Sequence, residues 1–426
     1  MPKLTNQDEE RYTRYKDRAV FYGTFAHTVH GKVGLVTRKT PVITLPAKLE
    51  DWKQDVTLTG VSLEGYISQI LHEVLITGRC GVLVERSVDG ENLYLASFLA
   101  EDIVNWRADY GVVQLVVLQE RSWEHSATDP YEVAIQTRYR ELFLDGGIYK
   151  QRIWTKVVNN GKSEWVSEEI MPNRMAHPLD HIPFTFFGVS DIGCVPGKPP
   201  MLDLAYLNLA HYRNSADFEQ KLHILAAGTP WAVGIDMDEK PTEVGPEVLW
   251  SSRHADAKFG IMEYSSSGGD LFHMAMAEKK DAMSSLGAKL IEQQRNQVET
   301  AETARLRISS QTSVLANIVK TAEVGLANVL KDVVAWELGD ATEVSVMIPK
   351  DFLNDRLTAQ EISALVQAWQ NGAISFDTLT YNLNQGEIYP EDFDLDSEAA
   401  LLKTAKQGSS QFNDQTTPAD VVWTNN

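Results

Sequence analysis

The chain has 426 residues, 43% of them hydrophobic, which is enough to bury the cores of two or three domain-sized units. Its formal net charge of −20 excludes a general nucleic-acid clamp, because such proteins bind phosphates through a basic surface. Cys80 and Cys194 form no Cys-x-x-Cys unit, so we expect neither a disulfide framework nor a thiolate zinc site. The start of the chain is polar and charge interrupts every apolar stretch, so we expect a soluble protein made in the cytoplasm, without a membrane segment.

The negative charge is concentrated near the C-terminus. Residues 351–426 carry twelve acidic residues against three basic ones, a net charge of −9. One interpretation of this excess is simple solubility. The other is a surface that repels DNA, so that DNA does not adhere to it.

The first 190 residues predict helices followed by an antiparallel sheet. Residues 8–36 and 62–77 have apolar side chains at three- and four-residue spacing, and Gly78 ends the second helix. Turn residues such as Asp145-Gly146-Gly147 and Asn159-Asn160-Gly161 then separate short strand-like segments. The expected strands are 82–85, 93–99, 112–119, 133–144, 148–157 and 164–170. This part of the chain therefore predicts an α+β domain.

The organisation changes after Pro183. The Pro199-Pro200 pair opens a helix expected to run to Ala227, on the order of 40 Å long. A small insert at 228–269 follows, with two strand-like pieces, and a second helix is expected at 276–294. The pattern predicts two helices that flank a compact head.

The longest helical pattern spans residues 302–337, on the order of 50 Å. Its apolar residues alternate at spacings of four and three, which is typical of a helix that packs against another helix: Leu315, Val319, Ala322, Leu326, Leu330 and Val333. Gly325 in the middle predicts a weak point or a kink. A strand at 343–348, an acidic helical region at about 358–383 and a disordered polar tail are expected to follow.

Several motifs suggest an enzyme but fail on their spacing. Gly193-Cys-Val-Pro-Gly197-Lys198 has one residue too few for a phosphate-binding loop and lacks the following Ser or Thr. The histidine pairs 27/30 and 177/181 have no third ligand at a metal-site spacing. Adjacent acid pairs are expected by chance among 59 acidic residues, and no nucleophile elbow is present. The sequence therefore predicts no catalytic, metal or cofactor site.

Four segments resemble a portal protein family common in short-tailed bacteriophages and prophages. They are KDRAVFY at 16–22, LITGRCG at 75–81, AEDIVNW at 100–106 and KPPMLDLAYLNLAHYR at 198–213. The order of the predicted elements is also similar to that of portal proteins over residues 8–400. The resemblance implies an N-terminal wing at 1–196, stem helices at 197–227 and 276–294, a clip at 228–275, a tunnel loop at 295–301, the remaining wing at 302–356, a helical crown at 357–407 and a disordered tail at 408–426.

The function implied by the resemblance is that of a ring at one capsid vertex of the virion, with twelve subunits as the usual number. Such a ring is the channel for packaging and ejection of double-stranded DNA, and is assembled in the host cytoplasm. The implied partners are the terminase motor, head–tail adaptor or tail proteins, and the major capsid and scaffold proteins. Weak, non-specific contact with DNA is expected in a channel formed by acidic subunits.

The resemblance also implies roles for individual residues. The tunnel loop that narrows the channel would include Arg295, Asn296, Gln297, Val298 and Glu299. The basic side chains of Lys289 and Arg295 would contact DNA phosphates transiently. Arg253, His254 and Lys258 would contribute to docking of partners at the clip. A head-completion or head–tail connector protein, and an acidic hydrolase, are the alternative functions.

Overall fold

The computed structural model contains both helices and strands, which confirms the α+β class. It describes residues 1–388 except for 2, 4, 6, 88–89, 91, 126–128, 130, 132, 160–161, 175–176, 228, 240–247, 263–268, 288–300, 340–343, 351, 353–356, 358 and 386–387. The chain divides into two units, Met1–Lys350 and Asp351–Asn426. The first unit contains the features considered below.

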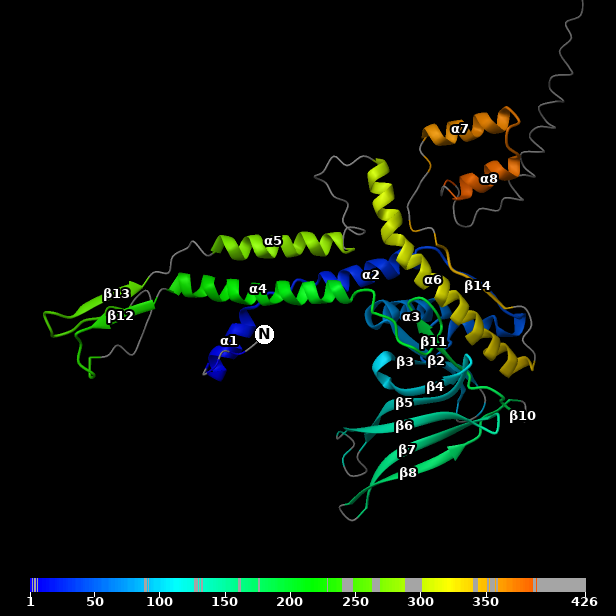
Figure 1. The fold of residues 1–426 in the computed structure, drawn as a ribbon, viewed down its shortest axis with the longest axis horizontal. Coiled ribbons are helices and arrows are strands. Elements are labelled where there is room, and N and C mark those ends of the chain that lie inside the picture. The colour runs from blue at the N-terminus through cyan, green and yellow to red at the C-terminus, as the bar shows by residue number, and fades with distance from the viewer. Residues whose placement is uncertain are drawn as a thin grey trace, which may run out of the picture. The chain divides into compact units, whose positions relative to one another are not determined.

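The centre of the first unit is helix α3 (Leu63–Thr77) on a three-stranded sheet (Figure 1). Ser62 caps the helix by accepting a hydrogen bond from the Gly65 N–H, and Gly78 ends it with a φ of 82°. The sheet has the order β11–β2–β3 and is antiparallel. Its strands are β2 (Arg79–Arg86), β3 (Leu93–Leu99) and β11 (Phe184–Gly188).

Helix α6 (Ala301–Leu338) is the longest described helix and packs against β11, β2 and α3. The six apolar residues that predicted a helix-packing face are all buried. By length and composition, Thr312–Leu338 could cross a membrane, contrary to the expectation from the sequence, but half of its apolar window is buried inside the protein. The core helix of a soluble protein passes the same test, so packing accounts for the composition.

A five-stranded antiparallel meander extends from the core (Figure 1). Its order β4–β5–β6–β7–β8 follows the chain, so each strand pairs with the next through a hairpin. Val116, Leu118, Leu142 and Tyr149 are buried near the core, whereas the residues of β8 are exposed throughout. The strands are β4 (Ile103–Asp109), β5 (Val112–His125), β6 (Val133–Asp145), β7 (Ile148–Asn159) and β8 (Lys162–Ile170).

An ionic network joins the two sheets. Arg140 on β6 contacts Glu85 on β2, and its Nε lies 2.7 Å from the Glu120 Oε1 on β5. Gln151 on β7 donates to Glu85 and to the Tyr149 hydroxyl, at 3.3 and 2.7 Å. Arg140, Glu85 and Glu120 are largely buried, so their charges compensate one another away from water.

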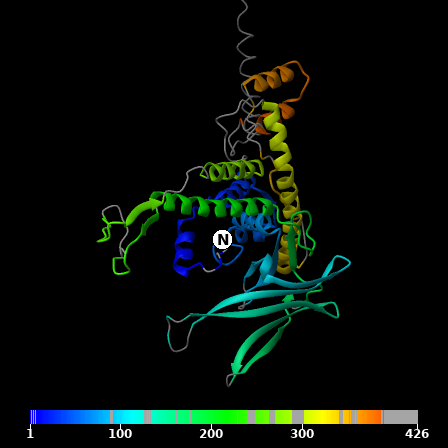
Figure 2. The same cartoon turned by 60° about the vertical axis from the view of Figure 1, so that its left-hand side comes forward.

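Two antiparallel helices form a stalk that projects from this core (Figures 1 and 2). They are α4 (Leu202–Ala227) and α5 (Gly269–Ser285), which pack against each other along their length. Between them the chain forms a two-stranded hairpin of β12 (Thr229–Val233) and β13 (Lys258–Met262) at the far end of the stalk. The predicted arrangement of two helices around a compact head is therefore present.

The predicted N-terminal helix is divided in two. Helix α1 (Glu9–Arg18) ends where Ala19 becomes extended, and α2 (Thr24–Val36) starts after Gly23. Helix α1 lies against α4, where the Tyr15 hydroxyl donates to Asp217 at 2.6 Å. The prediction of one continuous helix was therefore wrong. The two helices pack on different partners, α1 on the stalk helix α4 and α2 on α3, and the chain breaks at 19–23 between them.

The remaining elements are short. In the first unit they are β1 (Val42–Thr44), which pairs with β14 (Ser345–Met347), the 3-10 turns Ala47–Leu49, Asp51–Gln54 and Ala100–Asp102, and the pair β9 (Asn173–Arg174) and β10 (His177–Pro178). The second unit contains α7 (Ala359–Gln370) and α8 (Phe376–Gln385), with Gly372 at a φ of 72° in the turn between them. The region predicted to be helical at 358–383 is thus a helical hairpin.

Other predicted boundaries also need correction. Helix α4 starts two residues after Pro200, and α5 starts at Gly269, so the segment between the helices ends before the expected boundary at 275. Strands β4 and β11 were not predicted from the sequence. Residues 289 and 295–299, the expected tunnel loop and channel bases, lie outside the described residues, as does the predicted tail at 408–426.

Candidate interaction surface of the helical stalk

The base of the stalk is fixed to the core at the segment 189–200. Gly78 adopts a φ of 82°, and a Cβ at this position would lie 2.8 Å from the Gly197 carbonyl oxygen. The chain can therefore pass this closely only if residue 78 is glycine. Met201 and Leu204, the first apolar residues at the start of α4, are buried in the core.

Arg79 holds the same segment from the other side. Its buried guanidinium donates to the carbonyls of Cys194, Ala100 and Ile103 at 3.2, 3.3 and 3.4 Å, and lies 4.1 Å from the ring centroid of Trp106. These contacts tie the connection before α4 to the sheet. The direction in which the stalk leaves the core is thus set by the LITGRCG segment.

Large apolar side chains are exposed along the stalk. Leu271 and Met274 on α5 are 68% and 59% exposed, and they lie on the same face one turn apart. Tyr206, Leu209 and Leu222 on α4 are exposed as well. Exposed apolar side chains one turn apart, as at 271 and 274 and at 206 and 209, are available for contact with another chain.

The linker between α1 and α2 crosses the stalk and closes one side of a cavity of about 330 Å³. The Ser215 hydroxyl donates to the Val20 carbonyl at 2.7 Å, and the Phe21 and Tyr212 rings meet edge to face. His211 also lines this cavity, and burial lowers its pKa. These contacts hold the linker on α4, and Lys280 of α5 lies 4.9 Å from the Tyr22 ring centroid of the same linker.

The hairpin at the end of the stalk has apolar side chains on both faces. Trp231 and Val233 share one face, with Trp231 covering the bare backbone of Gly260. Phe259 and Ile261 share the other face, where Trp250 packs edge to face on Phe259. Val233 and Ile261 are well exposed, so a two-stranded hairpin of this kind leaves apolar surface to be covered.

The three predicted docking residues lie together at this hairpin, but two of them have acidic neighbours. The His254 Nε2 is 2.7 Å from Asp236, and this hydrogen bond raises the pKa of His254. The Arg253 backbone N–H donates to Glu239 at 3.0 Å, while its side chain stays exposed. Lys258 is exposed at the start of β13. The local charge is therefore less positive than the sequence suggested.

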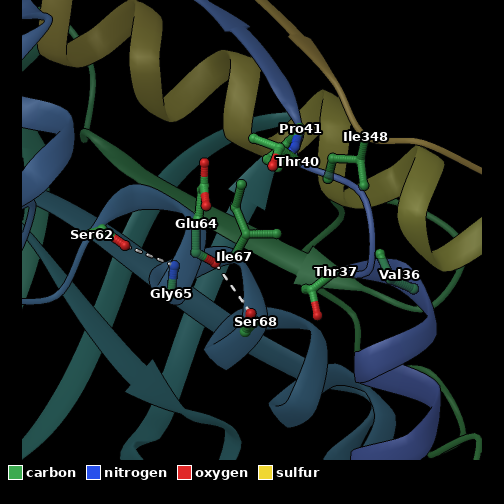
Figure 3. A pocket seen from close by; sticks show the side chains of 10 residues that line it. All are labelled: Val36, Thr37, Thr40, Pro41, Ser62, Glu64, Gly65, Ile67, Ser68 and Ile348. Carbon is green, nitrogen blue, oxygen red and sulfur yellow. Dashed lines mark hydrogen bonds between the residues drawn. The ribbon is translucent and has the colours of Figure 1, made fainter. Parts of the chain in front are cut away.

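The cavities offer no obvious catalytic arrangement in the described part of the chain. The cavity in Figure 3, about 250 Å³, is lined by hydroxyl groups and one carboxylate, that of Glu64. Ser62 and Ser68 both hydrogen-bond to backbone groups of α3, so neither hydroxyl is paired with a base. No group of three His, Cys, Asp or Glu side chains suited to a metal ion occurs among the described residues.

One histidine of each pair noted in the sequence, His30 and His181, contacts other residues than its pair partner. The His30 ring lies 5.3 Å from that of His72, on α3. His181 bridges Asp180 and Asp332 at 2.9 and 3.0 Å, and these hydrogen bonds raise its pKa to about 9. The position of His181 links the segment before β11 to α6, a contact that sequence reasoning could not find because 151 residues separate His181 and Asp332.

Comparisons with known proteins identify few relatives by sequence and several by structure. The family model "Domain of unknown function (DUF4055)" matches residues 200–337, which include the stalk. No curated protein matches the chain. A chain from the neck of an empty gene transfer agent (GTA) particle is 12% identical, with a TM-score of 0.42, and the alignment covers 88% of this chain and 94% of that chain.

Two further solved structures are similar. A chain of the native GTA virion is 12% identical with a TM-score of 0.41, covering 88% of this chain and 94% of that one. An HK97 family phage portal protein from Corynebacterium diphtheriae is 11% identical with a TM-score of 0.33, covering 80% of this chain and 99% of that chain.

Proposed function

We propose that this chain is the subunit of a portal ring at a capsid vertex of a phage-like particle. The observation that carries the proposal is the two-helix stalk with an apolar hairpin at its end and exposed Leu271 and Met274 along it. Such a stalk buries its apolar face only against another chain. Repetition of one heterologous contact around an axis covers this face and closes into a ring.

The proposed division follows the elements of the chain. The α+β core would be the wing, α4 and α5 the stem, the hairpin segment the clip, and α6 the long wing helix. Residues 295–301, with Arg295–Glu299, would be the tunnel loop. Arg295 and Lys289, which precedes the loop in the stem segment 276–294, would be the basic residues that line the channel. Residues 357–407 would be the crown, and twelve is the proposed number of subunits.

The charge of the chain suits a channel that must release its cargo. Twelve copies would carry a formal charge of roughly −240, twelve times −20. DNA in the channel would then meet a mostly repulsive electrostatic field, with a few transient contacts between its phosphates and basic side chains. We therefore propose packaging and ejection of double-stranded DNA as the function, without sequence-specific binding and without an enzymatic activity.

Partners are proposed at the exposed ends of the subunit. Arg253, His254 and Lys258 lie on the hairpin, where the terminase motor and later an adaptor or tail protein would dock. The major capsid and scaffold proteins would contact the wing. The portal ring would be a component of the virion. Reversing the three charges should weaken docking at the clip while the subunit stays folded, as judged by its melting temperature.

Mass photometry and negative-stain electron microscopy of the purified protein test the ring directly. The expected particle has a central hole and a mass of roughly 570 kDa, twelve times the 47.6 kDa of the chain. Because assembly can require a scaffold, the measurement is repeated after co-expression with the capsid and scaffold genes of the same particle. A protein that stays monomeric in both preparations, but binds a ring formed by another protein, would be a connector instead.

A further inference from the structure

The buried face of α2 carries three polar side chains one turn apart, at positions 24, 28 and 32. The hydroxyls of Thr24 and Thr28 are buried and have no hydrogen-bond partner among the described residues. Lys32 is only 5% exposed, and none of the described residues forms a hydrogen bond or an ion pair with it. Burial alone lowers its pKa. Polar groups of this kind are normally satisfied in a folded protein.

Lys32 forms part of the lining of a cavity of about 240 Å³. Most of the remaining wall is buried and apolar: Leu75, Met201, Leu315 and Ile318. Leu286 and Val314 are 47% and 53% exposed, so they mark the open side of the cavity. A Cβ on Gly287 would lie 3.3 Å from the Lys32 Cε, so the glycine leaves room for the lysine side chain.

An ammonium group in such a place is costly. A charged group that loses most of its hydration without a partner is destabilised, and a neutral amine would still leave its hydrogen bonds unmade. The complementary group is a carboxylate on an apolar stem, because the cavity offers one cation and otherwise apolar walls. Its volume of about 240 Å³ is enough for the end of one side chain.

We propose that an acidic side chain of a second copy of this chain enters the cavity and pairs with Lys32 when the subunits assemble. The inference rests on the proposed ring. A second copy is favoured over a free anion because the exposed Leu286 and Val314 at the opening gain from contact with protein, which a small ion would not supply. The chain has 59 acidic residues, and a heterologous contact brings a different surface of the neighbour to this cavity.

Substitution Lys32→Met tests the inference, because it keeps the length and apolar stem of the side chain and removes its charge. In dilute subunits, the melting temperature should rise by roughly 2–4 °C, since the unpaired charge is gone. In assembly, the protein concentration at which half of the subunits are in rings should rise at least tenfold. The matched control is Lys320→Met, which removes one exposed charge from α6. It should change neither quantity.

Three outcomes would overturn the inference. One is assembly of Lys32→Met at the concentration of the wild type. Another is a lower melting temperature of the dilute variant, which would mean that Lys32 is satisfied inside its own subunit. The third is stabilisation of the dilute wild type, but not of Lys32→Met, by sodium acetate or phosphate at constant ionic strength, which would identify a free anion as the ligand.

Failure of the proposed ring can be recognised separately, because the wild type itself would then form no ring in any preparation. If Lys32→Met does not fold, Lys32→Gln is measured in the same way, since it also removes the charge but keeps a polar group. Assembly of Lys32→Gln at the wild-type concentration would equally contradict the pairing.

Discussion

Two phenylalanine rings of β11 lie on glycines of the neighbouring elements. A Cβ on Gly81 of β2 would lie 2.1 Å from the Phe184 ring, and one on Gly325 of α6 would lie 2.5 Å from the Phe187 ring. Phe184 and Phe187 point to opposite faces of the strand, so both faces of β11 are held by this kind of contact. Gly325 is therefore a packing position, and this role, rather than a weak point in the helix, accounts for its place in α6.

Substitution Gly325→Ala should destabilise the protein by about 1–2 kcal/mol. The gain in helix propensity is about 1 kcal/mol, but a Cβ 2.5 Å from the buried Phe187 ring forces the ring to shift, and such overpacking of a core costs about 2–3 kcal/mol, the upper part of the usual range. The control is Gly34→Ala in α2, where a Cβ meets nothing within 4 Å. Gly34→Ala should raise the free energy of unfolding by about 0.5–1 kcal/mol. Urea denaturation measures both, and a stabilised Gly325→Ala would contradict the packing role.

His181 predicts a pH-dependent contribution to stability. Hydrogen bonds to Asp332 and Asp180 raise its pKa from 6.5 to about 9 in the folded protein, so folding favours the protonated form. The contribution is therefore complete below pH 6.5 and is lost as the pH rises toward and through about 9. Because the side chain is 42% exposed, solvent screening limits it to about 1 kcal/mol.

The measurement is the melting temperature of the wild type and of His181→Gln between pH 6 and pH 10. The difference between the two proteins should be largest near pH 6 and should vanish above about pH 9. A difference that is constant across this range would mean that the imidazole acts by packing, without a change of protonation.

At the scale of elements, the first unit depends on the junction of two sheets. The three-stranded sheet carries the core, and the five-stranded meander joins it near Val116, Leu118 and Leu142. Arg140 is the centre of the polar contacts across this junction, because it binds carboxylates from β2 and β5. This buried network of charged side chains thus fixes the orientation of the meander relative to the core.

Substitution Arg140→Met should cost about 3–5 kcal/mol of unfolding free energy, since it leaves Glu85 and Glu120 buried without their cation. Arg152 provides the control, because it pairs with Glu141 and Glu169 on the more exposed part of the same sheet. Arg152→Met should cost less than about 1 kcal/mol. Chemical denaturation compares the two variants, and equal effects would contradict a special role for the junction.

At the scale of the whole molecule, the first unit combines a well-packed core with a stalk that has little core of its own. Among the described residues of α5, only Met283 has a fully buried side chain. Leu271 and Met274 of the same helix are exposed. An element with this distribution adds little to the stability of the single subunit. The proposed assembly of subunits would cover its apolar face.

The double substitution Leu271→Glu and Met274→Glu should therefore prevent ring formation and leave the subunit folded. Charges on an apolar contact lose their hydration when copies associate, and they repel the acidic neighbour. Val166→Glu on the exposed strand β8 is the matched control for adding charge at an exposed apolar position outside the stalk. Particle masses measure assembly, and circular dichroism measures folding. Rings from the double variant would exclude this face of α5 from the subunit contact.

The sequence by itself determined the elements whose signals are local. The apolar periodicity of α6, the cap and glycine at the ends of α3, and the Gly-rich turns of the meander each depend on residues close in the chain. The paired stalk helices with a hairpin between them were predicted for the same reason. The resemblance to portal proteins rested on this order of elements and on four short segments.

Only the tertiary structure decided the contacts between distant segments. These contacts depend on residues that the fold brings together: the break between α1 and α2, the bridge from His181 to Asp332, the packing of Phe187 on Gly325 and the burial of Lys32 beside a cavity. Burial and pairing are properties of the packed chain, because a side chain's free energy depends on the atoms around it. The same lysine would be an ordinary surface charge on an isolated helix.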